Sequence, residues 1–175
     1  KNWDMMRRAS SAHGTGGMQS YAISAVDNAI WDLKGKLLGK PVYELLGGPV
    51  KEDIFCYASN TMLKYKTSDY IDWFLELGFK AVKVFLRHGP EEGLSGLNKN
   101  VEIVAKTREQ IGADIELAVD SWMSLNIEYA VRISEALKPY NIKWLEDYML
   151  PEDMDSYAKL RQRVPGQTLA TGEHW

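Results

Sequence analysis

The fold is decided by residues 114–147, DIELAVDSWMSLNIEYAVRISEALKPYNIKWLED. DIELAVD at the start and IKWLED at the end are short apolar runs of strand length, each closed by an acidic residue. IEYAVRISEALKPY between them repeats apolar and small residues at helical spacing. A strand, a helix and a second strand in this order predict two neighbouring parallel strands joined by a right-handed crossover.

The same unit repeats on both sides of this stretch. Further strands are predicted over 53–59, 80–86 and 168–173, and further helices over 68–78, 100–112 and 153–164. Strands that alternate with helices at this period predict an α/β fold, a (β/α) barrel. A complete barrel of eight units needs about 250 residues. With about five units in the chain, we expect only a partial barrel.

A different pattern precedes the alternation. Residues 20–38 carry apolar groups at helical spacing, and Gly39 with Pro41 is expected to end that helix. The strand-like rhythm begins only at residue 53. We therefore expect two domains: a helical part over 1–52, and the first part of the barrel, with the metal-binding residues, over 53–175.

The bulk composition indicates a globular chain without a basic surface. It has 175 residues, 45% of them hydrophobic and 26% charged, and a formal net charge of −3. No nucleic-acid or membrane partner is expected, since there is no positive excess and no apolar stretch of spanning length. The single cysteine, Cys56, lies in an apolar run and is expected in the core, which fits a reducing, cytoplasmic location.

Three acidic residues close successive strand-like runs: Asp120, Glu146 and Glu173, which are 26 and 27 residues apart. In a parallel sheet such residues gather at one end of the strands, where barrel enzymes build their sites. Three carboxylates are hard oxygen ligands, so the pattern predicts a site for Mg²⁺. Each residue taken alone is better explained as a solvated strand end or a helix cap, and only the three together favour the metal site. Because side chains alternate along a strand, Asp147 is expected to point away from Glu146, toward the helices.

Other candidates lie near the same end of the sheet. Lys83 is a candidate catalytic residue, because a lysine beside a metal steadies a carboxylate or an enolate. His174 is a second one, as an acid beside the metal. His88, in the loop after the second strand, and Trp122, two residues after Asp120, are candidate substrate contacts. For the lysine a solvated charge, and for the histidines a structural imidazole or an exposed loop position, remain open alternatives.

The segment SAVDNAIWDLKGKLLGKPVYELLGG (24–48) resembles the signature of the mandelate racemase/muconate lactonizing enzyme branch of the enolase superfamily. The resemblance implies that residues 1–52 are the last helices of an N-terminal capping domain that precedes the barrel. It also implies that Asp120, Glu146 and Glu173 are the family's Mg²⁺ ligands. HGPEEGLSGLNKN (88–100), DSWMS (120–124) and TGEH (171–174) are similar to family members that dehydrate sugar acids of the L-rhamnonate type.

Two departures from the common family pattern restrict which of the family's reactions fit this sequence. Trp122 stands where many relatives have asparagine, and Lys83-Val84-Phe85 keeps only the first lysine of a Lys-x-Lys pair. The second lysine is the usual base on one face of the substrate. Its absence speaks against racemase and cycloisomerase activities that use it, and it fits dehydratases with a base on the opposite face.

The resemblance thus implies a lyase that forms a 2-keto-3-deoxy acid through a metal-stabilised enolate. The general base of relatives belongs to a His-Asp dyad on later strands, which would follow Trp175. Two alternatives stay open: a dehydratase for another acid sugar, such as gluconate, galactonate or arabinonate, and a non-catalytic partial barrel without the base. The expected partners are a small sugar acid and further copies of the chain, since a partial barrel leaves two strand edges unpaired.

Overall fold

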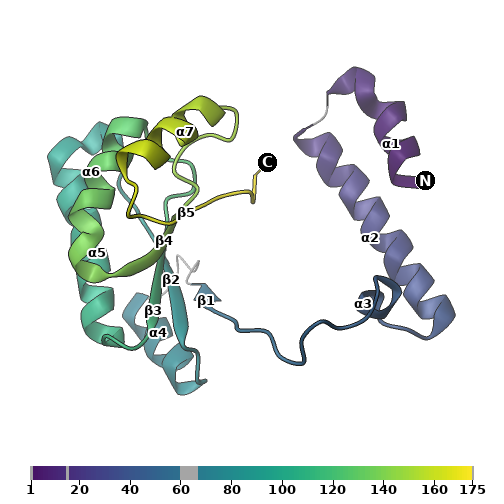
Figure 1. Ribbon diagram of the computed structural model, residues 1–175, viewed down its shortest axis with the longest axis horizontal. Helices are drawn as coiled ribbons and strands as arrows, with labels where there is room; N and C mark the ends of the chain where they lie inside the picture. Colours follow the sequence, from purple (N-terminus) through teal and green to yellow (C-terminus); the bar gives the residue numbers. More distant parts are fainter. Residues whose placement is uncertain (1, 15, 60–66, 175) are drawn as a thin grey trace. The chain divides into compact units, whose positions relative to one another are not determined.

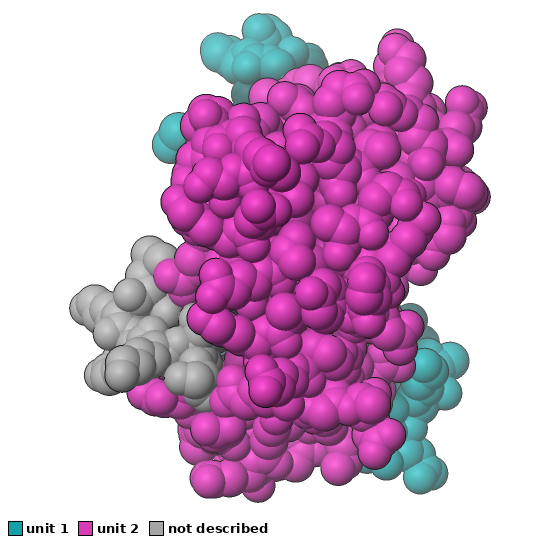
Figure 2. Space-filling model, turned by 90° about the vertical axis from the view of Figure 1, so that its left-hand side faces the viewer, with its two compact units in different colours: residues 1–54 teal, residues 55–175 magenta. Residues whose placement is uncertain are grey.

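The computed structural model describes residues 2–14, 16–59 and 67–174. The chain divides into two compact units, residues 1–54 and residues 55–175, which Figure 2 shows in separate colours. Each unit has its own secondary structure and is described by itself. None of the described helices is both long enough and apolar enough to cross a membrane.

The first unit is helical. It contains α1 (Asn2–Ser10), a short 3₁₀ helix (Ser11–His13), α2 (Met18–Leu38) and α3 (Val42–Leu45). The predicted helix over 20–38 is confirmed and begins two residues earlier. It ends at Gly39, which has the left-handed conformation (φ 62°) and donates its backbone N–H to the last carbonyls of the helix. Glycine takes this conformation without a steric cost, which is why it stops the helix here.

The second unit is a five-stranded sheet covered by helices (Figure 1). All neighbouring strands are parallel and follow each other in chain order. The strands are β1 (Ala58–Ser59), β2 (Ala81–Phe85), β3 (Glu116–Asp120), β4 (Ile142–Glu146) and β5 (Leu169–Ala170). The helices are α4 (Thr67–Glu76), α5 (Gly93–Ile111), α6 (Ile127–Leu137) and α7 (Met154–Arg163), with 3₁₀ turns at Pro90–Glu92 and Lys138–Tyr140. The order without a switch point confirms the predicted α/β fold with part of a barrel.

The two faces of the sheet have different chemistry. The helix-covered face carries fully buried apolar side chains on β2, β3 and β4, which pack with apolar residues of α5, α6 and α7. Burying one such side chain contributes about 1.5–3 kcal/mol. The opposite face carries polar and aromatic residues at alternate positions of the same three strands: Lys83, Phe85, Asp120, Trp144 and Glu146. The alternation of strand side chains therefore places the candidate site residues on the face away from the helices.

Several sequence predictions need correction. The two outer strands contain only two residues each, so Glu173 lies three residues beyond the end of β5. Helix α5 begins at Gly93 rather than at residue 100. Gly96 within this helix serves close packing, because a Cβ at this position would lie 2.6 Å from the Cβ of Glu92. Cys56 is exposed, since it precedes the short β1.

Candidate metal centre

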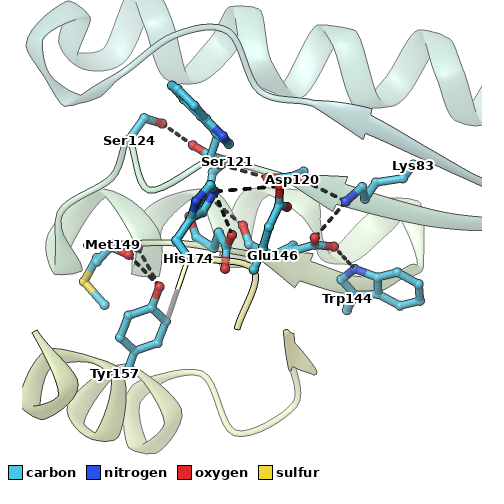
Figure 3. Close-up of polar contacts among 12 residues, drawn as sticks. Lys83, Asp120, Ser121, Ser124, Trp144, Glu146, Met149, Tyr157 and His174 are labelled. Atoms are coloured by element: carbon cyan, nitrogen blue, oxygen red, sulfur yellow. Dashed lines mark hydrogen bonds and ion pairs between the residues drawn. The ribbon is translucent and has the colours of Figure 1, made fainter. Parts of the chain in front are cut away.

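Strand register brings the first two candidate ligands side by side. Asp120 and Glu146 end β3 and β4 and are paired across the two strands. The Asp120 side chain is 1% exposed and that of Glu146 14%. Glu173 reaches the same place from the segment after β5, and one ligand atom from each of the three carboxylates lies within 4.8 Å of the others. The structure thus brings the three predicted residues together; Asp120 and Glu146 are labelled in Figure 3.

Lys83 lies between the first two carboxylates. Its Nζ is 2.9 Å from Oδ2 of Asp120 and 2.7 Å from Oε1 of Glu146, and its side chain is only 6% exposed (Figure 3). Burial lowers the pKa of Lys83, but the hydrogen bonds to Glu146 and Asp120 and the charges of both carboxylates outweigh this, so its pKa is raised. Burial raises the pKa of Asp120, and the hydrogen bond from Lys83 opposes that rise. The lysine is therefore a charged part of the site at neutral pH.

The second carboxylate oxygens of Asp120 and Glu146 also accept hydrogen bonds. The backbone N–H of Trp122 donates to Oδ1 of Asp120 at 2.9 Å. The indole Nε1 of Trp144 donates to Oε2 of Glu146 at 2.8 Å. Trp144 precedes Glu146 by two residues and so lies on the same face of β4. Both carboxylates are fixed by donors on each oxygen, which pre-organises them without any ligand.

The loops at this end of the sheet are tied together by Ser121. Its hydroxyl donates to the backbone carbonyls of Glu146 and Asp147, at 3.0 and 3.1 Å. Trp122, Met123 and Asp147 have positive φ values of 46°, 63° and 43°. Such conformations are unfavourable for residues other than glycine, and they cluster where surrounding contacts enforce them, often at functional sites.

Asp147 does not follow the strand alternation that the sequence suggested. Its left-handed backbone ends β4 at Glu146, and its side chain joins Glu173 and His174, with ligand atoms within 4.8 Å of one another. The Nε2 atom of His174 is 3.7 Å from Oδ2 of Asp147 and 4.0 Å from Oε1 of Glu173. The rings of Trp122 and His174 meet edge to face at 6.0 Å. The predicted candidates Trp122 and His174 therefore both lie beside the carboxylates.

His88 is held in a separate cluster. It follows β2, and its Nδ1 lies 2.7 Å from Oε1 of Glu92. Asn100, fully buried on α5, accepts from the backbone N–H groups of Arg87 and His88 and donates to the His88 carbonyl. Within the described residues, no hydrogen bond or ion pair joins the His88 ring to the three carboxylates.

The residues fit Mg²⁺ by their chemistry and arrangement. Three carboxylates converge at one end of the sheet, and Lys83 is the one cation that the described residues place in contact with Asp120 and Glu146. Hard oxygen ligands are the donors that Mg²⁺ prefers, and a site with few protein ligands leaves positions for water or for a substrate.

These features define a class: an α/β barrel protein whose acidic residues meet at the carboxyl ends of successive parallel strands. Comparison with family models agrees with that class. Residues 69–175 match the family described as enolase C-terminal domain-like, and residues 1–47 match the mandelate racemase / muconate lactonizing enzyme N-terminal domain. The chain belongs to the enolase superfamily, in its mandelate racemase/muconate lactonizing enzyme branch, which confirms the resemblance seen in the sequence.

Individual relatives narrow the comparison. The chain is 46% identical to an L-rhamnonate dehydratase of Saccharopolyspora erythraea over 99% of its own length and 43% of the relative. The crystal structure of rhamnonate dehydratase from Gibberella zeae complexed with Mg is 37% identical, with a TM-score of 0.88 over 98% of this chain and 40% of that one. The 3,6-anhydro-D-galactonate cycloisomerase of Zobellia galactanivorans is 32% identical, with a TM-score of 0.87 over 98% and 47%. The chain spans less than half the length of these relatives.

Sequence reasoning missed several residues that build the centre. Trp144, Ser121 and Asn100 were assigned no role, and Asp147 was placed on the wrong side. A signal existed for Trp144, because a residue two positions before a ligand shares its face of the strand. For Asn100 there was none, since a buried asparagine in a helix becomes meaningful only when its partners are known.

Proposed function

We propose that this chain carries the Mg²⁺ site of a sugar-acid dehydratase of the L-rhamnonate type. The observation that carries the proposal is the convergence of Asp120, Glu146 and Glu173 at the carboxyl ends of successive parallel strands. The similarity to L-rhamnonate dehydratases supports the substrate class. In this proposal residues 1–52 belong to a capping domain and residues 53–175 form the first part of the barrel. A cytoplasmic location and self-association remain predictions.

Asp120, Glu146 and Glu173 would hold the ion. A bound Mg²⁺ supplies Lewis-acid stabilisation of negative charge on a substrate carboxylate, which makes removal of the neighbouring α-proton feasible. Lys83 keeps a positive charge between two of the ligands and limits their mutual repulsion. Trp144 fixes the second oxygen of Glu146, so the carboxylate is oriented before any ion arrives.

Two further residues have proposed roles at the substrate. His174, whose Nε2 lies beside Asp147 and Glu173, would hold or donate a proton to a departing hydroxyl. Trp122 is 61% exposed and covers His174 edge to face, so it offers an apolar wall to the substrate. His88 is proposed to bind substrate from the β2–α5 loop, oriented by Glu92.

Mg²⁺ binding by the chain itself is the first test. Isothermal titration should detect about one Mg²⁺ per chain. Asp120→Asn and Glu146→Gln should each weaken binding by more than about 100-fold, beyond the 10- to 100-fold typical of outer-sphere partners. Glu116→Gln at the opposite end of β3 is the matched control and should leave binding unchanged. Equal Mg²⁺ affinity in the wild type and in both ligand variants would refute the site.

The reaction needs a separate measurement. The protein that carries this chain should form a 2-keto acid from L-rhamnonate in a Mg²⁺-dependent manner. Parallel assays with gluconate, galactonate and arabinonate would identify another acid-sugar dehydratase if one of these is turned over faster. Mg²⁺ binding without turnover of any sugar acid would favour the non-catalytic alternative.

A further inference from the structure

A second group of metal-ligating side chains lies beside the first and shares one residue with it. Asp147, Glu173 and His174 each offer a ligand atom, and these atoms lie within 4.8 Å of one another; His174 is labelled in Figure 3. We propose that this group binds a second divalent cation, Zn²⁺, next to the Mg²⁺ site. The proposal does not depend on the dehydratase reaction; where Zn²⁺ occupies Nε2 of His174, that nitrogen is a ligand and not the proton donor proposed above.

Burial supplies the first argument. Asp147 is only 2% exposed, yet its Oδ2 has no hydrogen-bond partner among the described residues. The same holds for the buried Nε2 atom of His174. Both atoms are directed toward each other at 3.7 Å, which is too long for a direct hydrogen bond. Leaving a buried carboxylate oxygen and a ring nitrogen without partners is costly, and a cation between them removes both costs.

Charge supplies the second argument. Four carboxylates gather here, and Lys83 contacts only Asp120 and Glu146. Within the described part of the chain, the ion-pair partner of both Asp147 and Glu173 is His174 alone. The second pair of carboxylates therefore lacks the kind of fixed cation that the first pair has, and a divalent ion would provide it.

Donor chemistry identifies the ion. One imidazole nitrogen with two carboxylates suits Zn²⁺, whereas Mg²⁺ prefers oxygen alone. Zinc bonds of about 2.1 Å at tetrahedral angles place ligand atoms about 3.4 Å apart. The observed separations from His174 Nε2, 3.7 Å to Asp147 and 4.0 Å to Glu173, exceed this by about 0.3 and 0.6 Å. Glu173 has a side chain that is 59% exposed and can close the difference.

Zinc titration in saturating Mg²⁺ tests the proposal. Equilibrium dialysis of the wild-type chain should find about one Zn²⁺ per chain, in addition to Mg²⁺. Asp147→Asn and His174→Gln should each weaken Zn²⁺ binding at least about 10- to 100-fold and leave Mg²⁺ binding in place. Substituting Co²⁺ for Zn²⁺ gives a visible absorption band that should depend on His174. Asp155→Asn on α7 and His13→Gln in the first unit are matched controls and should behave like the wild type.

The outcomes separate this inference from the proposed function. Asp120→Asn should lose Mg²⁺ and retain Zn²⁺, which shows two sites. Loss of both ions in Asp120→Asn, or unchanged Zn²⁺ affinity in Asp147→Asn and His174→Gln, would overturn the second site. Failure of Mg²⁺ binding alongside His174-dependent Zn²⁺ binding would instead overturn only the proposed function. Circular dichroism and urea midpoints must first show that each variant is folded.

Discussion

The carboxylates that end β3 and β4 differ sharply from the one that follows β5. Asp120 and Glu146 are almost buried, lie in strand register and are tied to Lys83, while the side chain of Glu173 is 59% exposed beyond its strand. The sheet therefore fixes two ligands of the candidate metal centre, and a loop delivers the third. Two of the three ligands are thus positioned by the strands themselves, at an electrostatic cost that a single lysine offsets.

Replacing Lys83 should have the largest effect on the stability of the folded chain. Lys83→Met leaves two nearly buried carboxylates facing each other, and loss of one partner from a buried ion pair costs about 3–5 kcal/mol of unfolding free energy. Urea denaturation would measure it. Lys143→Met is the matched control. Lys143 on β4 pairs with Glu116 on β3, and this ion pair is exposed. That variant should lose less than about 1 kcal/mol. Equal losses in both variants would contradict the proposed role of Lys83.

Added Mg²⁺ should restore part of the stability lost in Lys83→Met, because the ion replaces the missing positive charge. Saturating Mg²⁺ stabilises any chain that binds it when folded, by about 2.7 kcal/mol at a concentration 100 times the dissociation constant. The gain should be larger for Lys83→Met than for the wild type, since the ion then relieves the unpaired carboxylates. A smaller gain in the variant would indicate that Lys83 serves mainly to arrange the ligands.

The stability difference between the wild type and Lys83→Met should depend on pH in a defined direction. The pKa of Lys83 is raised in the folded state, so the folded chain holds this proton more tightly than the unfolded chain does. Its contribution is complete below the unfolded value of about 10.4 and is lost as the pH rises through the folded pKa. The stability gap between wild type and Lys83→Met should stay constant from about pH 7 to 9 and narrow above about pH 10.5. A gap that narrows between pH 7 and 9 would contradict the raised pKa.

Substitutions that affect the loop after β2 should have an intermediate effect on stability. Asn100 makes four hydrogen bonds: it accepts from the backbone N–H groups of Arg87 and His88 and donates to the His88 carbonyl and to the Tyr129 hydroxyl. Asn100→Leu removes three hydrogen bonds to part-buried backbone groups of Arg87 and His88 and should cost about 3 kcal/mol. Tyr129→Phe removes one hydroxyl and should cost about 1 kcal/mol. Denaturation of both variants checks the order, and a reversed order would show that the asparagine is not the main anchor.

The smallest expected effect concerns the second oxygen of Glu146. Trp144→Phe removes the donor at 2.8 Å and keeps most of the ring, so it should cost about 1 kcal/mol in stability. It should weaken Mg²⁺ binding about 10-fold, because an outer partner of a ligand is lost. Titration calorimetry measures the change. Trp31→Phe in the first unit is the control. Similar Mg²⁺ affinities in both variants would show that Trp144 does not support metal binding.

Much of the architecture was predictable because it follows local periodicity. The central strands and the helices α6 and α7 lie close to where the pattern of apolar residues placed them. The outer strands were overestimated, since among the described residues β1 spans only Ala58–Ser59 and β5 only Leu169–Ala170. The start of α5 was missed because glycines are typical of loops, whereas Gly96 lies inside the helix and packs closely against Glu92 and His88, contacts that depend on the neighbouring loop.

The sequence by itself determined that acidic residues recur once per strand-helix unit, and therefore that Asp120, Glu146 and Glu173 meet at one end of the sheet. Only the tertiary structure decided that Lys83, 63 residues before Glu146, joins two of them, and that Asp147 turns toward His174. The physical reason is that periodicity is a local property of the chain. Contacts across strands depend on register, and the direction of Asp147 depends on a positive φ that neighbouring loops enforce.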